Sequence, residues 1–438
     1  MAHQYPRNKK ELKNSDEVKD NFFSLLKQNS VWSFLTGVYI FLWFIQIGDR
    51  IELFKEVRFE FILGSLLTIG AIVTLLSNRE KINNEIKAPA LILIIYFSFF
   101  VILSVDMELS WQIYFNFVIK YSLVTLFIAV FIDTLPKLKF LFICFFAAVA
   151  KLAQEGFNGW LFGGLIWQSQ GVPRLHGSID RLGHPNSFSG FAVSMLPFIY
   201  YYYRISSPKL KLFFGYLGGC MLIIIMATGS RTGYVATVLL SVIVFWKTLK
   251  KNFIKSIIIF PLILTVTIQF LPDSYKARFE SIYTQNEIEG GSTGARIQII
   301  EDAVEVFSQY PMGVGIAGFP TIRMEMFGRF QDTHNMYLQI LTNTGFIGLL
   351  LFLFLIIRII KVNKNVLLLT KDKENEFAFL RATSSALIGY ILARLFLGIF
   401  GMDMYEIYWW FAGGLTIACH SITTQILSKS KDKQLTNE

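Results

Sequence analysis

The residues best suited to chemistry in this 438-residue chain lie between 291 and 350, and the first of them is Arg296. It begins a helix expected over 295–309, whose apolar residues recur at about 100° per residue on one face. Arg296 lies near the middle of that face, just after the potential caps Ser292 and Thr293. A guanidinium beside unpaired helix N–H groups is an arrangement that binds phosphate. The alternatives are that Arg296 extends to the membrane surface or pairs with a core carboxylate.

The second residue is His334, at the start of an apolar helix expected over 336–360. Asp332 or Thr333 can cap this helix, so we expect His334 in its first turn, where the helix field disfavours protonation. A neutral imidazole can accept a proton from a substrate hydroxyl. A capping or interfacial role is the alternative for a histidine at this position.

Three further arginines precede these two, namely Arg174, Arg181 and Arg231. The topology below brings all of them to one side of a membrane, together with Arg296. Because arginine is disfavoured in outer connections, such a group favours an anionic ligand there. Some of these arginines are instead expected to pair with acids. The acids available for such pairs are Asp180, Glu301 and Asp332.

The elements that must position these residues are membrane helices, because 53% of the residues are hydrophobic, 16% are charged and the mean hydropathy is +0.49. Apolar runs of about 17 to 25 residues recur along the chain, which predicts an all-α polytopic membrane protein. Three separated cysteines favour neither a disulfide framework nor a zinc site. We expect twelve spans, at residues 31–47, 59–77, 88–105, 111–132, 138–152, 187–204, 210–228, 232–247, 253–271, 336–360, 377–400 and 405–427.

Lysine collects in every second connection, which predicts that the tails 1–30 and 428–438 are cytoplasmic and that the single transmembrane domain covers 31–427. The stretches 153–186 and 272–335 are then long extracytoplasmic loops. Topology explains the formal charge of +10 without nucleic acid. Arg394, the main charge inside a predicted span, is expected to pair with one of two nearby acids, Asp403 and Glu406. A lipid-linked phosphate or pyrophosphate fits this layout, and no GxxxxGK[ST] nucleotide motif competes with it.

An ordered set of motifs resembles the O-antigen ligase and polymerase superfamily of bacterial surface-polysaccharide glycosyltransferases. The motifs are RLHG…GHPN (174–186), SRTG (230–233), GAR (294–296), PMGVG (311–315) and HNMYLQILTNTGFIGLL (334–350). The resemblance implies a GT-C-like helical fold, an undecaprenyl-pyrophosphate-linked glycan as donor, and neither metal nor nucleotide cofactor. Its implied pyrophosphate ligands are Arg296 with one of Arg174 and Arg181, with Arg231 as a further candidate. It also implies that His334 orients or deprotonates the acceptor hydroxyl. The supporting residues would be Asn186, Asn335, Gly313 and Gly315.

We expect a polymerase that joins lipid-linked repeat units on the outer face of the bacterial cytoplasmic membrane. The chain is rich in Lys, Ile, Asn and Phe, as in low-GC Gram-positive bacteria, which have no lipid A core to act as a ligase acceptor. Flippase and chain-length regulator proteins are the candidate protein partners. The alternatives are a ligase that uses another acceptor, a lipid-linked oligosaccharide flippase or transporter, and a structural assembly subunit. Twelve helices also suit a transporter, but the chain shows no internal repeat.

Overall fold

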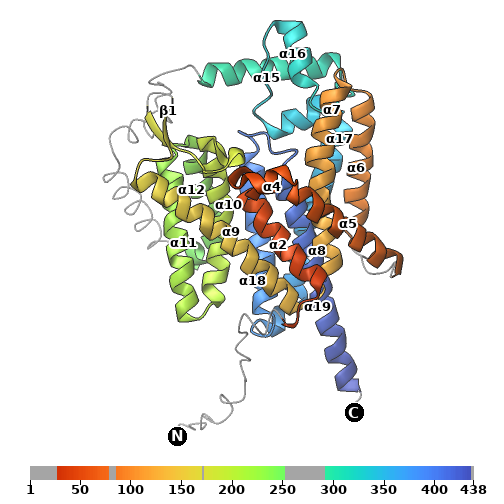
Figure 1. The fold of residues 1–438 in the computed structure, drawn as a ribbon, viewed down its shortest axis with the longest axis vertical. Helices are drawn as coiled ribbons and strands as arrows, with labels where there is room; N and C mark the ends of the chain where they lie inside the picture. Colours follow the sequence, from red (N-terminus) through yellow and green to blue (C-terminus); the bar gives the residue numbers. More distant parts are fainter. Residues whose placement is uncertain (1–26, 78–84, 170–171, 252–291, 436–438) are drawn as a thin grey trace.

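The computed structural model describes residues 27–77, 85–169, 172–251 and 292–435, which are almost entirely helical (Figure 1). Within these ranges, five helices are long and apolar enough to cross a membrane: Phe59–Ser77, Met107–Phe131, Pro208–Ala227, Met336–Leu369 and Ala378–Leu397. An all-α membrane protein is therefore confirmed, while twelve spans and a GT-C-like arrangement stay predictions. The expected span 253–271, the part of the second loop before 292 and most of the N-terminal tail lie outside the described residues.

The first half of the chain contains helices of 4 to 27 residues and one short hairpin. Its elements are α2 (Val31–Ile45), α3 (Ile47–Arg50), α4 (Glu52–Glu56), α5 (Phe59–Ser77), α6 (Lys87–Ile102), α7 (Met107–Ile113), the π-helix η2 (Tyr114–Ile119), α8 (Lys120–Phe131), α9 (Leu135–Leu161), β1 (Ile166–Ser169), β2 (Val172–Leu175), the 3₁₀-helix η3 (Asp180–Leu182), α10 (Pro185–Ile205) and α11 (Pro208–Ala227).

The second half contains the longest helix of the described chain, which has 34 residues. Its elements are α12 (Arg231–Lys251), α15 (Ser292–Gln309), α16 (Phe319–Phe327), α17 (Met336–Leu369), the 3₁₀-helix η4 (Lys371–Lys373), α18 (Ala378–Leu397) and α19 (Ile407–Leu435). The bundle is built from the pairs α10 with α11 and α18, α8 with α19, α2 with α9, and α17 with α6 and α18.

Helix α9 is longer than the expected span 138–152, because it continues to Leu161. The apolar run thins out near residue 150, but small buried residues extend the packed face through Ala153, Gly156 and Gly159. A Cβ on Gly156 would lie 2.6 Å from the ring of Phe188 on α10, so this glycine allows the two helices to approach closely.

The hairpin of β1 and β2 was not predicted from the sequence. Its two antiparallel strands pair Ile166 with Leu175 and Ser169 with Val172. Val172 and Leu175 are fully buried, and Arg174 lies between them on β2. The hairpin therefore fixes the backbone from which the candidate ligand Arg174 projects.

Helices α15 and α16 form a lobe across one end of the bundle, at the top of Figure 1, and α19 extends at the opposite end. A small apolar core packs this lobe and is separate from the main core of the bundle. Its buried members are Ala303, Val306, Val314, Phe319 and Ile322. The lobe is thus a packed element and can hold side chains against the bundle.

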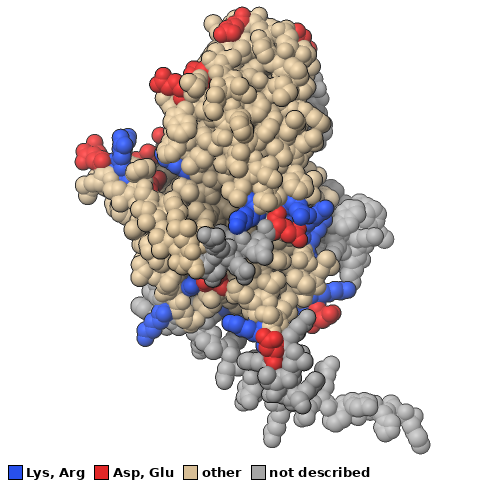
Figure 2. Space-filling view, turned by 90° about the vertical axis from the view of Figure 1, so that its right-hand side faces the viewer, with Lys and Arg blue, Asp and Glu red and all other residues tan. Residues whose placement is uncertain are grey.

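One side of the molecule shows a broad uncharged face between acidic side chains near the lobe and lysine and arginine side chains lower down (Figure 2). Exposed apolar residues of α6 and α17, among them Phe99, Phe346 and Phe354, belong to the helices on this side. Such a face is typical of a protein surface in contact with lipid.

Candidate active site

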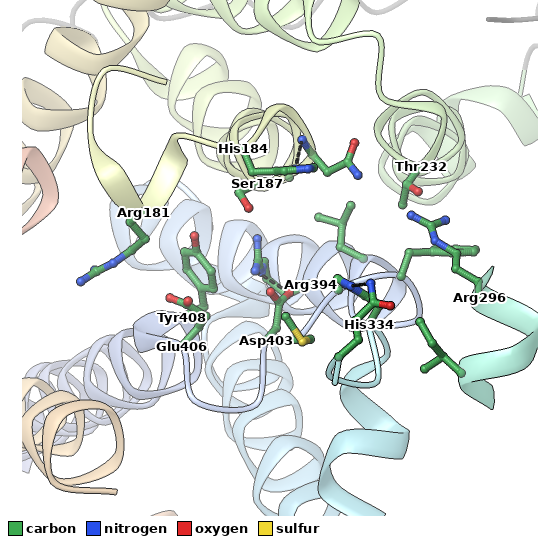
Figure 3. A pocket seen from close by; sticks show the side chains of 18 of the residues that line it. Arg181, His184, Ser187, Thr232, Arg296, His334, Arg394, Asp403, Glu406 and Tyr408 are labelled. Carbon is green, nitrogen blue, oxygen red and sulfur yellow. Dashed lines mark hydrogen bonds and ion pairs between the residues drawn. The ribbon is translucent and has the colours of Figure 1, made fainter. Parts of the chain in front are cut away.

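A cavity of about 650 Å³ lies where the loop before α10, the start of α12, the first turns of α15 and the loops before α17 and α19 meet; we call it the first cavity (Figure 3). Four of the predicted site residues line it: Arg181, Asn186, Arg296 and His334. Arg174, Arg231, Gly313, Gly315 and Asn335 are absent from its lining. Long-range folding therefore brings Arg296 and His334 together, as the motif order predicts.

His334 lies just before α17, not in its first turn. The helix is capped by Asn335, whose Oδ1 accepts hydrogen bonds from two backbone N–H groups of the first turn, at 2.9 and 3.1 Å. The expectation that Asp332 or Thr333 caps this helix is wrong. His334 has a φ of 48°, a left-handed conformation that only the surrounding contacts can hold.

The environment of His334 favours a neutral imidazole that can act as a base. Burial lowers the pKa of His334, and Arg296 and Arg323 lower it further, while Asp332 opposes this shift. The predicted neutrality thus has burial as its main cause. Its Nε2 lies 2.9 Å from the side-chain nitrogen of Gln331. Because an amide nitrogen can only donate, Nε2 accepts in this arrangement and the ring proton lies on Nδ1.

Arg296 reaches the first cavity from α15. The predicted caps Ser292 and Thr293 lie within this helix, which begins at Ser292. The expected apolar face is split: Ile299, Ala303 and Val306 are buried, whereas three residues of the predicted face are 44 to 55% exposed. These exposed residues are Ile297, Ile300 and Val304.

Asp302 fixes α15 to the rest of the lobe. Its carboxylate accepts from Arg323 Nε at 2.8 Å and from Arg329 Nη2 at 2.7 Å. Burial would raise the pKa of Asp302, but these two guanidiniums hold it below its usual range. The acid that fixes this lobe is Asp302. It is not one of the three acids that were expected to pair with the candidate arginines, which are Asp180, Glu301 and Asp332.

The PMGVG turn packs against a break in α17. Gly345 has φ 70° and ψ −177°, which interrupts the helix. Beside this break, the backbone N–H groups of Val314 and Gly315 donate to the carbonyls of Thr342 and Asn343 at 2.8 and 2.9 Å. The glycine turn thus packs its backbone closely against the segment that follows His334.

Side chains would block this contact. Gly313 and Gly345 both have positive φ, and a Cβ on Gly345 would lie 2.7 Å from the carbonyl oxygen of Met312. A Cβ on Gly313 would lie equally close to Asn343 O. Glycine is therefore required at both positions for the loop and the broken helix to meet.

Arg174 is almost completely buried, with 1% of its surface exposed, and its guanidinium binds other parts of the protein. Its Nε donates to the carbonyl of Thr228 at 2.8 Å and its Nη2 to Asn186 Oδ1 at 2.6 Å. These bonds connect β2, the end of α11 and the start of α10. Arg231 begins α12, and its neighbour Thr232 is the residue that lines the first cavity.

His184 is a cavity residue that the sequence-based site did not include. It caps α10, because its Nδ1 accepts from the backbone N–H of Asn186 at 3.1 Å. The proton of a neutral ring then lies on Nε2, which makes that atom a donor. Partial burial and the cations Arg174 and Arg296 lower the pKa of His184, with His334 acting in the same direction. The signal for it was the position directly before Pro185-Asn186, a helix start.

The first cavity also contains an ion pair between Arg394 of α18 and Asp403, which confirms one of the two expected partners. The Arg394 guanidinium lies 3.6 Å from the centre of the Tyr408 ring. Burial raises the pKa of Asp403, and Arg394 counteracts this shift. Arg394 therefore lines the cavity with a carboxylate and an aromatic ring as its partners.

Arg181 lies at the opposite end of the first cavity from Arg296 (Figure 3). Its guanidinium is 3.9 Å from the centre of the Trp43 ring and donates to the Tyr121 hydroxyl at 2.8 Å. Its charge acts on two acids, Glu60 and Glu406. Arg181 and Arg296 therefore belong to separate clusters.

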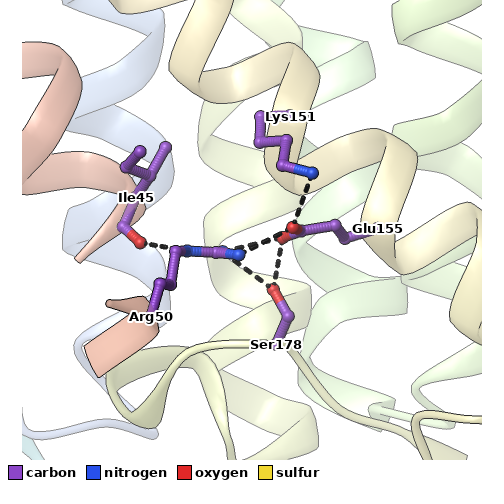
Figure 4. Close-up of polar contacts among 5 residues, drawn as sticks. All are labelled: Ile45, Arg50, Lys151, Glu155 and Ser178. Carbon is purple, nitrogen blue, oxygen red and sulfur yellow. Dashed lines mark hydrogen bonds and ion pairs between the residues drawn. The ribbon is translucent and has the colours of Figure 1, made fainter. Parts of the chain in front are cut away.

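The loop that carries Arg181 is held by a network around Glu155 of α9 (Figure 4). Arg50 binds both carboxylate oxygens at 2.7 Å, Ser178 donates at 2.6 Å and Lys151 lies at 3.1 Å. Partial burial opposes ionisation, but these three donors lower the pKa of Glu155 to about 2. The network ties α3, α9 and the loop before η3 together.

Parts of this chain are similar to known proteins. Residues 216–353 match the family described as O-antigen ligase, a range that contains Arg231, Arg296 and His334. The chain is also similar to a ComP-specific O-oligosaccharyltransferase of Acinetobacter baylyi, at 26% identity over 212 residues. That match covers 46% of this chain and only 38% of the relative's length. The resemblance to the O-antigen ligase superfamily is thereby confirmed.

Proposed function

We propose that this chain, with its resemblance to the O-antigen ligase superfamily, is a surface-polysaccharide polymerase. It would transfer a glycan from undecaprenyl pyrophosphate to a sugar hydroxyl of a second lipid-linked repeat unit. The observation that carries the proposal is the first cavity, in which Arg296 lies with two imidazoles of opposite hydrogen-bonding roles. His334 offers an acceptor nitrogen and His184 offers a donor.

The proposed reaction is a displacement at the anomeric carbon of the donor glycan. The acceptor hydroxyl replaces the Gln331 amide as the hydrogen-bond donor to His334 Nε2, and this nitrogen then takes the hydroxyl proton. The hydroxyl oxygen forms a new bond to the anomeric carbon as the bond from that carbon to the pyrophosphate breaks. Negative charge then grows on the departing phosphate oxygen, where the Arg296 guanidinium and the His184 N–H stabilise it. These contacts are stronger in the transition state than in the ground state. The guanidinium is worth about 100-fold in rate and the single N–H of His184 about tenfold.

The other predicted residues support this arrangement. Arg174 and Asn186 bind one another and fix the start of α10 beside His184. Asn335 caps α17 and also donates to the carbonyl of Ile399 at 3.0 Å, which fixes the backbone next to His334. Gly313 and Gly315 hold the turn against α17. We therefore assign Arg174 a positioning role and keep Arg296 as the pyrophosphate ligand.

We infer that the first cavity opens on the extracytoplasmic side of the bacterial cytoplasmic membrane, with both termini inside. The lysine-rich connections and the acidic side chains near the lobe support this orientation. On that side the donor must arrive already activated by its pyrophosphate, so the proposal includes no nucleotide or metal cofactor. Flippase and chain-length regulator proteins remain proposed partners.

A ligase is the second candidate, and the similarity to an O-oligosaccharyltransferase favours it. In that case the same cavity would bind the same donor, and the hydroxyl would belong to another acceptor, such as a protein side chain. The chemistry at His334 and Arg296 would not change. The two candidates therefore differ in the acceptor alone.

The decisive experiment uses purified protein in nanodiscs with a synthetic undecaprenyl-pyrophosphate repeat unit and EDTA, without nucleotide. The wild type should form a ladder of longer lipid-linked products. His334→Ala should lose the ladder, with a rate lower by roughly 10²–10⁴-fold. His420→Ala is the matched control, since His420 lies on α19 outside the cavity lining. Equal ladders from wild type and His334→Ala would overturn the assigned base. If the wild type binds the lipid-linked repeat unit but forms no longer products, the polymerase proposal is overturned.

A further inference from the structure

A second cavity of about 790 Å³ lies on the other side of Arg181, and nothing in the proposed reaction so far uses it. It is formed by α2, α4, α5, η2 and α8. Arg181 lines both cavities, and its guanidinium packs on Trp43 and Tyr121 at the boundary. The two cavities thus share one cation.

The lining of the second cavity combines apolar walls with an excess of positive charge. In the part of the chain that the structure describes, its charged lining residues are the cations Lys55, Arg58, Lys120 and Arg181 and the acid Glu60. Much of the remaining lining is aromatic or aliphatic, including Phe61 and Ile69 of α5, which are 55% and 61% exposed. An anionic head with a long apolar tail matches both parts of this lining.

Lys120 supports a functional site because of its place in the chain. It lies within the candidate membrane span Met107–Phe131, where an ionisable residue is costly and commonly marks a ligand or ion site. Its ammonium lies 2.6 Å from Asn116 Oδ1, an amide that cannot neutralise its charge. Asn116 also lines the second cavity.

The backbone around Lys120 is irregular in the same place. The π-helix η2 ends at Ile119, directly before Lys120, and Phe115, Asn116, Phe117 and Ile119 from it line the cavity. Single π-turns inside longer helices occur frequently at functional sites. Arg58, which also lines this cavity, has a φ of 49°, which is unusual for a residue other than glycine. Both backbone irregularities therefore occur at residues that line the second cavity.

We propose that the second cavity binds the diphosphate head of a second lipid, the carrier of the acceptor repeat unit, with its isoprenoid tail along α5. This inference rests on the proposed polymerase, because polymerisation needs two lipid-linked substrates at once whereas transfer to a protein needs one. Lys120 and Arg58 bind the acceptor's diphosphate, and Arg181 lies between the two lipid heads. The acceptor's sugar chain extends past Arg181 to place its hydroxyl at His334.

The test measures how many equivalents of undecaprenyl pyrophosphate bind to the protein in nanodiscs of phosphatidylcholine. Wild type should bind two. Lys120→Met with Arg58→Gln should weaken one of the two sites at least tenfold, which corresponds to about 1.4 kcal/mol. Lys120→Arg should retain both sites, which shows that charge and not shape is required. Lys364→Met is the matched control, because Lys364 is an exposed lysine of α17 outside both cavities.

The outcomes separate this inference from the proposed function. If wild type binds one equivalent that is lost in Arg296→Ala and kept in Lys120→Met, the second site is overturned while the transferase proposal stands. Displacement of the second equivalent by equimolar phosphatidylglycerol would assign the cavity to a bilayer lipid and also overturn the inference. The inference is supported if wild type binds two equivalents, if the double variant Lys120→Met with Arg58→Gln loses one of them, and if phosphatidylglycerol displaces neither. This holds even if no ladder of products forms.

Discussion

Two walls of the first cavity are held by different kinds of interaction. The wall that carries His334 depends on backbone hydrogen bonds and on glycines at positive φ, where the PMGVG turn meets the break at Gly345. Arg296 joins this wall from α15, which Asp302 attaches to the lobe. The wall that carries Arg181 and His184 depends on charged side chains, in the Glu155 network and the bond from Arg174 to Asn186. The first wall is therefore sensitive to added side-chain volume, and the second to charge and pH.

This difference fits the proposed division of labour. A base and a phosphate ligand must be held close to one geometry, because a displacement of about 1 Å can cost 100-fold in rate. Backbone contacts give that precision. The other wall faces the second cavity, where lipid heads must enter and leave, and side-chain contacts there can rearrange more easily.

After His334→Ala, the largest effect should come from Arg296. We expect Arg296→Ala to lower the rate of glycan transfer about 100-fold, and Arg296→Lys to be nearly as damaging, because an ammonium cannot form the two parallel bonds of a guanidinium. The measurement is the initial rate of ladder formation. Arg204→Lys, at the far end of α10, is the control and should behave as wild type. Full activity of Arg296→Lys would show that the Arg296 guanidinium does not stabilise the transition state.

The backbone-held wall can be broken at Gly345. Gly345→Ala adds a Cβ 2.7 Å from Met312 O at a φ of 70°, so we expect a loss of about 3 kcal/mol in unfolding free energy at every pH. Thermal unfolding of the detergent-purified protein measures it. Gly219→Ala on α11 adds a Cβ with no atom within 4 Å and is the matched control. Equal stability of the two variants would show that the turn and α17 do not depend on glycine.

A smaller effect should come from His184. His184→Asn keeps a side-chain oxygen to cap α10 but withdraws the N–H from the cavity. We expect thermal stability to stay unchanged while kcat/KM falls about tenfold, the cost of one hydrogen bond to a charged oxygen. His176→Asn, on the same loop but outside the cavity lining, is the control. An unchanged kcat/KM in His184→Asn would leave His184 as a cap only.

Much of the backbone-held wall could be predicted from the sequence. Apolar run length indicated α17, which follows His334, and the order of motifs placed Arg296 and His334 in one site. The cap of α17 could not be chosen, because Asp332, Thr333 and Asn335 are equivalent candidates by local pattern. A tertiary contact decides among them, since only the Asn335 amide also reaches the carbonyl of Ile399.

The charge-held wall was harder to predict, because its contacts join distant parts of the chain. Arg174 and Arg181 are both arginines of one loop, and no local rule separates them. Thr228, 54 residues away, binds Arg174 and buries it, whereas Trp43 and Tyr121 hold Arg181 at the edge of both cavities. The hairpin β1–β2 was missed because four-residue strands carry too short a pattern to be distinguished from a loop.

The smallest effect should be the pH dependence of the charge-held wall. The pKa of Glu155 is lowered from 4.5 to about 2 in the folded protein, so its network contributes fully above pH 4.5 and is lost as pH falls through about 2. Because the group is partly exposed, we expect Glu155→Gln to cost only about 1 kcal/mol at pH 7. The difference from wild type should shrink between pH 4.5 and 2. Glu56→Gln, an exposed acid of α4, is the control. Thermal unfolding across this range measures all three proteins, and a constant difference at every pH would show that the network acts through shape and not charge.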